Sequence, residues 1–424
     1  MGNKIAKRWF YEIDVTLDSP LNLSNGEDYY TDSDVMTNGD GEYVVPGTSI
    51  AGAFRNYLTD LGVGDVDSIF GYSKGEEGRM SPLFISDMVL GNDNGKLGIR
   101  DFVALSEDKI VENKFDAQIL EPGVSGTIRM EYVQREDMHD INTEIDRIIS
   151  GIAFGDIRFG GNKNRGFGRF RVGNIRRKCF AKKDDLLGFL KNPVFEKDDE
   201  QGFEEWEKSY EGDKHSYIKV QVPLKLTGGI SIRRYSAVPG RPDYEHITSN
   251  GKPIIPGTSW NGAIRSDVGR ILKDFGMKDA ERVITEWFGN AKKDEAKQSA
   301  IVFSESVIEN SEPVPMTRNQ IDRFSGGTRE GALYAEVSCF GGTTVLEYLV
   351  RKDGKFTNAL LKVMELAVED IVNGYIAIGG QTAIGRGIFT KGEGKVTCSE
   401  DISEKKMMKE LNYIINGGRS NEND

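Results

Sequence analysis

The sequence has few residues of the kinds that mark metal centres, disulfide frameworks and membrane spans. Among 424 residues there are 3 cysteines, and Cys179, Cys339 and Cys398 form no CxxC pair and leave an odd thiol. Neither a zinc ribbon nor a disulfide framework is therefore indicated, and we expect reduced thiols. No run approaches the ~18 apolar residues of a membrane helix, and the segment "MGNKIAKRWFYEIDV" carries no apolar signal core. We therefore expect a cytoplasmic protein with no membrane partner.

Familiar catalytic motifs are also absent. Only His139, His215 and His246 occur, and none has a partner at metal-ligand spacing or a twin elsewhere in a repeat, which disfavours a duplicated histidine acid/base site. The sequence has no GxSxG, no Walker lysine motif and no HExxH, so the common hydrolase and nucleotide-binding classes are not indicated. What does repeat is glycine, arginine and aspartate.

The charge is unevenly distributed along the chain. The formal net charge is -12, which argues against a generic polyanion binder. Much of the net negative charge lies in "EKDDEQGFEEWEKSYEGD", whereas residues 160–178 ("GGNKNRGFGRFRVGNIRRK") hold only basic charges. A ligand responds to charges within about 8 Å, so this cationic strip matters more than the total.

Two motifs each occur twice at nearly the same offset. "VVPGTSIAGAFRNYL" and "IIPGTSWNGAIRSDV" place Pro46 and Pro256 210 positions apart (256 - 46). "FGGNKNRGFGRF" and "IGGQTAIGRGIF" place Gly160 and Gly379 219 apart (379 - 160). A domain-sized internal repeat follows from these offsets.

Each half follows one order of expected elements: strand, helix, strand, strand, helix, strand. This order predicts an α+β fold of two tandem ferredoxin-like (RRM-like, βαββαβ) domains with inserted loops and hairpins. With a length that suits two or three domains, the expected division is a first domain at 1–178, an acidic linker at 179–214, a second domain at 215–400 and a C-terminal tail at 401–424.

The helix after each PGTS motif is predicted from apolar residues at helical spacing, which are Ile50, Phe54, Leu58 and Leu61 in the first half and Trp260, Ile264, Val268 and Ile271 in the second. Ser49 or Ser259 is expected to cap it, and Arg55 and Arg265 fall off the apolar stripe. Alone, PGTS is usually a turn plus a cap, yet a helix N-terminus is also a ready anion site.

The two Gly-rich elements align without a gap. Such a loop lets the backbone approach phosphates, while nearby arginines supply charge. One copy is as well explained as a turn that enters a strand, and the second copy in the same place favours a phosphate or RNA role. The residues of these elements that we expect to contact RNA are Gly160, Gly161, Arg165, Gly166, Gly168, Gly379, Gly380, Gly385, Arg386 and Gly387.

A polar loop with an early aspartate precedes each PGTS motif. Asp32 stands 14 positions before Pro46, and Asp243 stands 13 before Pro256. A metal-bound or base-acting aspartate there would suit RNA chemistry. Aspartate is common in loops, however, and the competing acids are Asp28, Asp34, Asp40 and Glu245.

Together, the PGTS helix, the "IDR" segment (Ile321 to Arg323) and the terminal GGxxxxGxG loop resemble the RAMP superfamily, the backbone subunits of CRISPR effector complexes. The likeness is to the Csm-type backbone subunit of type III systems, doubled as in fused type III-D-like subunits. The resemblance implies antiviral defence, with CRISPR guide RNA, complementary target RNA and other effector subunits as partners. It also implies that a protruding hairpin kinks the guide–target duplex.

Carried over by position, the resemblance makes Asp32 and Asp243 the catalytic and metal-binding residues of an endoribonuclease that uses a divalent metal, expected to be Mg²⁺. Ser49, Arg55, Ser259, Arg265 and the Gly-rich loops would hold guide RNA. The halves differ at the expected hairpin, where "VALSEDKIVENK" stands against "NQIDRFSGGTREG". Two alternatives stay open: a non-catalytic scaffold or capping subunit of the same superfamily, and a repeat-processing endonuclease.

Overall fold

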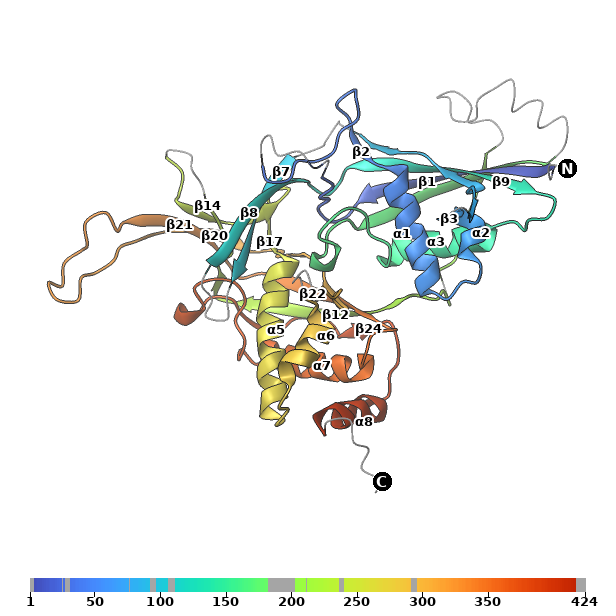
Figure 1. The fold of residues 1–424 in the computed structure, drawn as a ribbon. Coiled ribbons are helices and arrows are strands. Elements are labelled where there is room, and N and C mark those ends of the chain that lie inside the picture. Colours follow the sequence, from blue (N-terminus) through green and yellow to red (C-terminus); the bar gives the residue numbers. More distant parts are fainter. Residues whose placement is uncertain are drawn as a thin grey trace. The chain divides into compact units, whose positions relative to one another are not determined.

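The computed structural model describes residues 4–24, 26, 31–75, 77–91, 97–105, 111–181, 203–210, 212–235, 240–290 and 296–416. The chain forms two compact mixed α/β units (Figure 1). The first unit is Met1–Lys163 with Phe167–Ser216, and the second is Asn164–Gly166 with Tyr217–Asp424. None of the helices in these described ranges is both long and apolar enough to span a membrane.

An antiparallel sheet organises the first unit. Its strands are β1 (Ile5–Leu17), β2 (Tyr43–Val45), β5 (Leu83–Ile85), β6 (Met88–Leu90), β9 (Ser125–Arg135), β10 (Phe170–Phe180) and β11 (Glu204–Glu205). The order is β11-β10-β1-β9-β6-β2, and β5 also pairs with β9. Alternate residues of β1, such as Tyr11, Ile13 and Val15, are buried, as the period of two in a half-buried strand requires.

Helices cover one face of this sheet (Figure 1). They are α1 (Gly47–Asp60), α2 (Val66–Phe70) and α3 (Asn142–Phe154). On α1 the predicted stripe Ile50, Phe54 and Leu58 is fully buried, because positions four apart share one helix face. Two hairpins lie outside the main sheet: β3 (Tyr72–Lys74) with β4 (Glu77–Arg79), and β7 (Leu97–Leu105) with β8 (Val111–Leu120).

The second unit repeats the arrangement of the first with larger additions. Its main sheet has the strand order β18-β22-β12-β23, and β24 also pairs with β12. A second sheet has the order β13-β21-β15-β14, and β20 also pairs with β21. A third sheet has the order β16-β17-β19. These strands are β12 (Tyr217–Thr227), β13 (Gly229–Ile230), β14 (Arg233–Tyr235), β15 (Tyr244–His246), β16 (Thr248–Ser249), β17 (Lys252–Ile255), β18 (Ile301–Phe303), β19 (Ser306–Val307), β20 (Glu312–Arg318), β21 (Tyr334–Phe340), β22 (Thr343–Arg351), β23 (Ile388–Lys391) and β24 (Thr397–Cys398).

Four helices complete the described part of this unit: α5 (Gly257–Asp274), α6 (Ala280–Phe288), α7 (Thr357–Val372) and α8 (Glu404–Ile415). The predicted stripe Trp260, Ile264 and Val268 on α5 is fully buried, which confirms that Trp260 is a core residue. The neighbours β10-β1-β9-β5 of the first unit recur as β23-β12-β22-β18 here. The main sheets thus share one strand order.

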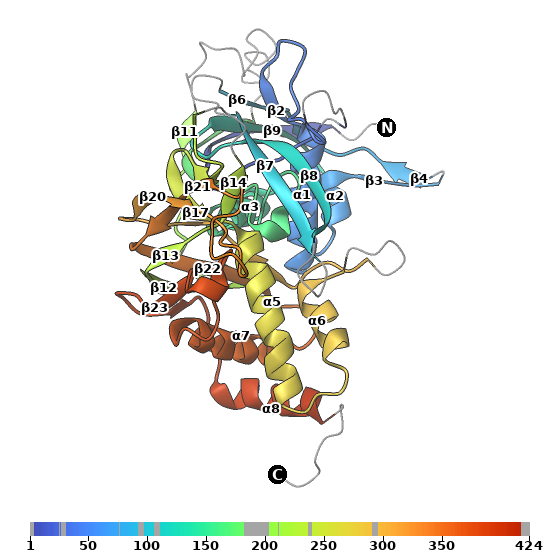
Figure 2. The ribbon, with the colours of Figure 1, turned by 90° about the vertical axis from the view of Figure 1, so that its left-hand side faces the viewer.

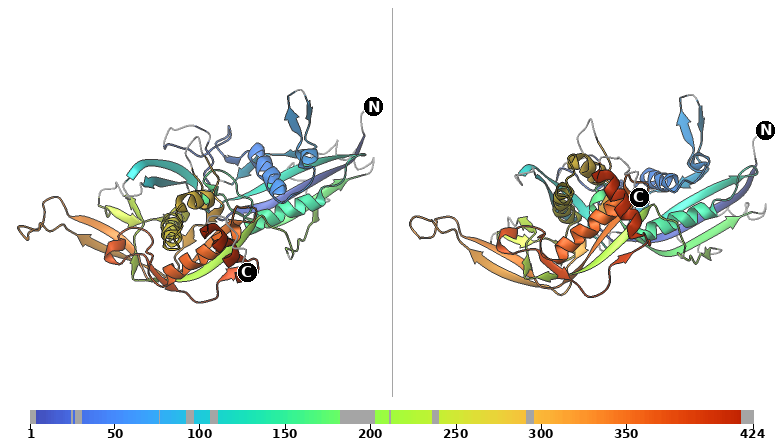
Figure 3. Two further views of the ribbon diagram at one scale, coloured as in Figure 1. Left: turned by 60° about the horizontal axis from the view of Figure 1, so that its bottom comes forward. Right: turned by 90° about the horizontal axis from the view of Figure 1, so that it is seen from below.

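The hairpin β20–β21 projects from the rest of the second unit (Figure 3). Its two strands pair antiparallel from Glu312↔Phe340 to Arg318↔Tyr334. Beyond them the tip is solvent-exposed, and the Phe324 side chain is fully exposed. Asp322 closes the tip turn by accepting hydrogen bonds from the backbone N–H groups of Phe324 and Ser325.

The C-terminal tail packs back onto the second unit. Helix α8 lies beside α7 and buries Leu411 and Ile414 (Figure 2). The Glu410 carboxylate accepts a hydrogen bond from the Ala359 N–H at 2.7 Å, near the start of α7 where the helix dipole favours an anion. Residues 404–415 of the expected tail therefore form a helix that packs on α7 of the same unit.

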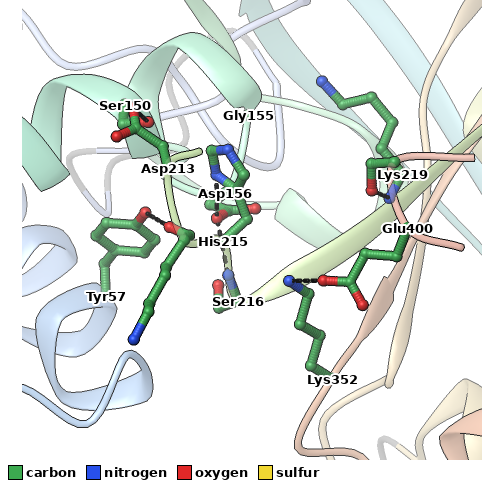
Figure 4. A network of polar contacts seen from close by, with 12 residues as sticks. Tyr57, Ser150, Gly155, Asp156, Asp213, His215, Ser216, Lys219, Lys352 and Glu400 are labelled. Atoms are coloured by element: carbon green, nitrogen blue, oxygen red, sulfur yellow. Dashed lines mark hydrogen bonds and ion pairs between the residues drawn. The ribbon is translucent and has the colours of Figure 1, made fainter. Parts of the chain in front are cut away.

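The segment around 213–216, at the end of the expected linker, is anchored in the first unit (Figure 4). His215 stacks on Phe154 with ring centroids 3.7 Å apart, and its Nδ1 lies 3.3 Å from the buried Asp156 carboxylate. The same carboxylate accepts from the Ser216 N–H. Asp213 accepts from Ser150 Oγ. Within the expected linker, 182–202 and 211 lie outside the described residues.

Candidate nucleic-acid interface

The PGTS motifs begin α1 and α5, but their serines do not cap these helices. Pro46 and Pro256 are the N-cap residues, and neither helix has a side-chain cap hydrogen bond. Ser49 and Ser259 lie in the first turn, where their N–H groups donate to the proline carbonyls at 2.9 Å. The predicted serine caps are therefore wrong, because proline at the N-cap moves each serine three positions into the helix.

The glycine of each motif is required by packing. A Cβ on Gly47 would lie 2.3 Å from the Ile85 carbonyl oxygen, and one on Gly257 would lie 2.3 Å from that of Phe303. The Gly47 N–H also donates to Asp87 Oδ1 at 2.7 Å. A carboxylate of the protein thus already uses part of the anion-binding capacity at the start of α1.

The two arginines on these helices differ in their surroundings. Arg55 forms an ion pair with Asp67 and donates from Nη1 to the Gly71 carbonyl at 3.0 Å, which ties α1 to the segment around α2. Arg265 is half-buried on α5, and no other described residue forms an ion pair or hydrogen bond with its side chain. Of the two, Arg265 has the guanidinium available for a ligand.

The Gly-rich loops adopt the same backbone conformation in both units. Positive φ angles occur at Gly160, Asn162, Gly166 and Gly168, and at the matching Gly379, Gln381, Gly385 and Gly387. Only glycine tolerates most of these positions without strain. A short 3-10 turn lies inside each loop, at Lys163–Arg165 and at Thr382–Ile384.

Much of the hydrogen-bonding capacity of these loops is used inside the protein. The N–H groups of Gly161 and Gly380 donate to the carbonyls of Asn22 and Ser231, at 2.6 and 2.8 Å. A Cβ on Gly387 would lie 1.9 Å from the Ile378 carbonyl, and one on Gly168 would lie 1.8 Å from the matching carbonyl, that of Phe159. These glycines are therefore explained by chain packing, without a phosphate.

The middle of each loop has different neighbours. Gly166, which belongs to the second unit, would place a Cβ 2.6 Å from the Phe303 carbonyl, and burial lowers the pKa of Arg165. A Cβ on Gly385 would meet no described atom within 4 Å. The Arg386 guanidinium lies over the Phe340 ring at 4.3 Å. The tip around Gly385 is consequently the more open of the two for a ligand.

Asp32 and Asp243 occupy matching positions relative to a hairpin. Asp32 Oδ2 accepts a hydrogen bond at 3.0 Å from the N–H of Asp116 on β8. Asp243 Oδ2 accepts one at 2.8 Å from the N–H of Ala335 on β21. In both units the donor lies on the returning strand of a hairpin, and both aspartates are exposed.

The competing acids of the first loop have other surroundings. Asp34 is buried and accepts from the backbone and hydroxyl of Thr31, so it supports the loop. Asp40 is an exposed turn residue whose N–H donates to Asn38 Oδ1. Asp28 lies outside the described residues. Asp32 and Asp116 are 84 positions apart, whereas Asp243 and Ala335 are 92 apart, so no common spacing in the sequence reveals these pairings.

The carboxylates present suit a metal that the protein shares with a substrate. In the described ranges, no group of three or more His, Cys, Asp or Glu residues is arranged to hold a metal ion. Mg²⁺ is commonly bound by one or two carboxylates together with substrate phosphates and water. Asp32 with its neighbour Asp116, or Asp243 alone, fits this second kind of site.

The sequence did not reveal a buried carboxylate beneath the second hairpin. Glu336 on β21 is 1% exposed and lies near two arginines, with Arg318 Nε at 2.7 Å and Arg233 Nη2 at 3.3 Å. Gln381 of the Gly-rich loop donates to it at 2.7 Å. Glu336 therefore fixes two arginines, from β14 and β20, and the neutral amide of Gln381 from the Gly-rich loop.

Two of the histidines are structural in these surroundings. His246 is buried, accepts from the Ile232 N–H at 3.2 Å and lies 2.9 Å from the Ile254 carbonyl oxygen. Burial lowers the pKa of His246 to about 4, so the ring is neutral at pH 7. His215 is packed against Phe154 as described above.

A comparison with protein-family models identifies the family of the chain. The family model of the RAMP superfamily matches residues 14–171 and 240–390, which is most of both units. No curated protein matches the chain.

Proposed function

Since the chain belongs to the RAMP superfamily, we propose that it is a guide-RNA-binding tandem backbone subunit of a type III CRISPR effector complex, and that it cleaves complementary target RNA. The superfamily is associated with CRISPR complexes, and its members typically bind CRISPR RNA and other subunits. Each unit is inferred to be a ferredoxin-like domain with inserted hairpins.

One observation carries the catalytic part of this proposal. Asp32 and Asp243 are exposed carboxylates, each held by a backbone N–H on the returning strand of a hairpin. No other described residue forms a hydrogen bond or ion pair with the second oxygen of Asp243. In the first unit the Asp32 N–H donates in return to Asp116 Oδ1 at 3.1 Å. Two equivalent aspartates at equivalent hairpins are what two repeated cleavage sites require.

The inferred chemistry is attack of a ribose 2′-hydroxyl on the adjacent phosphorus, with departure of the 5′-oxygen. Positioning contributes most of the rate, because the hydroxyl must lie in line with the leaving oxygen. A divalent metal, when bound, stabilises the charge that develops on the phosphate oxygens. Asp32 and Asp243 would hold that metal with the RNA phosphates, or accept the hydroxyl proton. The hairpins would force the local kink.

Guide binding is assigned to the elements with open polar groups. Arg265 and the loop around Gly385 and Arg386 are the favoured phosphate contacts in the second unit. Their polar groups are less engaged in hydrogen bonds and ion pairs within the protein than those of Arg55 or Gly161. Ser49 and Ser259 would then support the first turns of α1 and α5, and the remaining glycines would support the loop conformation.

A non-catalytic scaffold is the second candidate. The described residues form no metal cage of three or more ligands, and such a subunit would keep the loops for RNA while the aspartates serve only as hairpin anchors. Under this alternative Asp32 and Asp243 affect stability and not product length.

The two candidates are separated by Asp32→Asn and Asp243→Asn in the purified complex, with Asp40→Asn and Glu245→Gln as matched controls. Asparagine keeps an acceptor for the backbone N–H, so folding should be retained. Mapping of target-RNA products should show the loss of one specific cut per aspartate variant and unchanged cuts in the controls. Unchanged products in both aspartate variants would reject the nuclease and favour the scaffold.

A further inference from the structure

We propose that Tyr235, Tyr244 and Tyr334, the tyrosine face, bind one unpaired RNA base beside Asp243. This inference rests on the proposed function, because it adds a nucleobase site to the place where RNA is proposed to be cut. It is a site for an aromatic ring and is distinct from the loops that are assigned to phosphates.

The strand register brings the three rings together. Tyr235 on β14 pairs with Tyr244 on β15, and β15 runs parallel to β21, which begins with Tyr334. The ring centroids of Tyr235 and Tyr244 are 6.0 Å apart, and those of Tyr244 and Tyr334 are 6.2 Å apart, both edge to face. Tyr235 is 61% exposed. The chain of rings therefore ends in a large aromatic surface open to solvent.

The charges beside these rings favour a nucleotide over an apolar partner. The Arg233 guanidinium lies over the Tyr244 ring at 4.7 Å. Glu336 holds Arg233 and Arg318 in place, and both arginine side chains remain about one-third exposed (36% and 28%). Fixed cations interleaved with aromatic rings suit a stacked base whose backbone phosphates lie close by.

The tyrosine face and Asp243 are linked through the backbone. Asp243 directly precedes Tyr244, and its carboxylate accepts the N–H of Ala335, which directly follows Tyr334. The aspartate thus lies between two of the three tyrosines. A base held by these rings would keep its own ribose and phosphate next to Asp243, which is the positioning that the proposed cleavage needs.

Within the part of the first unit that the structure describes, the residue corresponding to Tyr334 offers no free ring. Phe115 precedes Asp116 as Tyr334 precedes Ala335, but Phe115 stacks on Phe102 with centroids 5.0 Å apart. Phe102 in turn packs against the buried Phe167. The base site is therefore assigned to the second unit, where the described residues supply the three rings.

The test is a pair of binding titrations with the full chain. Fluorescence anisotropy would measure the affinity for oligouridine of about ten nucleotides, within the range of single-strand site sizes, and for a ribose-phosphate oligomer of equal length without bases. Tyr235→Ala should weaken oligouridine binding about 5- to 10-fold, the lower part of the range for loss of one stacked base, and leave binding of the baseless oligomer unchanged. Tyr235→Phe should keep wild-type affinity, because the ring remains.

Tyr413→Ala, which removes a 44% exposed tyrosine on α8, is the matched control and should change neither affinity. An equal loss for both oligomers, or no loss, in Tyr235→Ala would overturn the base site while RNA binding itself stands. A wild-type chain that binds neither oligomer would overturn the base site and the proposed function together.

Discussion

Replacing Glu336 by glutamine should destabilise the second unit and leave the first unit unchanged. The carboxylate is 1% exposed and has Arg318 Nε, Arg233 Nη2 and Gln381 Nε2 within 3.3 Å. Glutamine keeps the shape but removes the charge, and its amide nitrogen cannot accept from these donors. Breaking a fully buried pair costs about 3–5 kcal/mol. Both arginines are partly exposed and regain water, so we expect about 2–3 kcal/mol.

For a unit of this size, each kcal/mol corresponds to about 2–4 °C in Tm, so the transition of the second unit should fall by about 4–12 °C. Differential scanning calorimetry would measure it, and the transition of the first unit serves as an internal reference. Glu245→Gln, on the neighbouring strand β15, should shift the transition by less than about 2 °C. A shift that small in Glu336→Gln would refute the view that this carboxylate organises the two arginines.

Three further results are expected. The pKa of His246 is about 4 in the folded protein and about 6.5 in the unfolded chain, so the unfolded state binds more protons between these pH values. The free energy of unfolding of the second unit should therefore fall by up to about 3 kcal/mol as the pH drops from 6.5 to 4. Urea unfolding at several pH values should show a smaller fall in His246→Gln. Gly385→Ala should lower the free energy of unfolding by about 1–2 kcal/mol, because of its positive φ alone. Gly387→Ala should lower it by several kcal/mol more, because the added Cβ would lie 1.9 Å from the Ile378 carbonyl oxygen. Equal losses of stability in thermal melts of the two variants would contradict the packing argument. Arg265→Ala should weaken RNA binding and reduce the slope of log binding constant against log salt concentration by about 0.7, without a change in Tm. Arg55→Ala should mainly lower Tm. The reverse pattern would reject the assignment of Arg265 to a phosphate.

Local patterns predicted the helices and strands of the repeat well. The stripes Ile50, Phe54, Leu58 and Trp260, Ile264, Val268 are buried because helical spacing alone decides which side of the helix faces the sheet. The aligned glycines correctly indicated a shared loop conformation, since positive φ is a local property. Serine caps were predicted wrongly, because PGTS reads as a cap signal while the proline carbonyl takes that place.

Long-range contacts could not be read from one sequence. The backbone N–H that donates to Asp243 lies 92 residues further along the chain. The side chains that contact Glu336 come from β14, β20 and the loop at residue 381. Burial of Phe167 in the Gly-rich loop depends on packing against Phe102 of the β7–β8 hairpin. No spacing rule links residues so far apart, and the repeat alone gave the hint that Asp32 and Asp243 are equivalent.

The most direct test of the account is to isolate the protein from its native cells and sequence the RNA that accompanies it. The account predicts uniform guide RNAs that carry a repeat-derived end, held in a complex with other effector subunits. Recovery of no RNA, or of a random sample of cellular RNA, would contradict it and would leave the Gly-rich loops as structural turns.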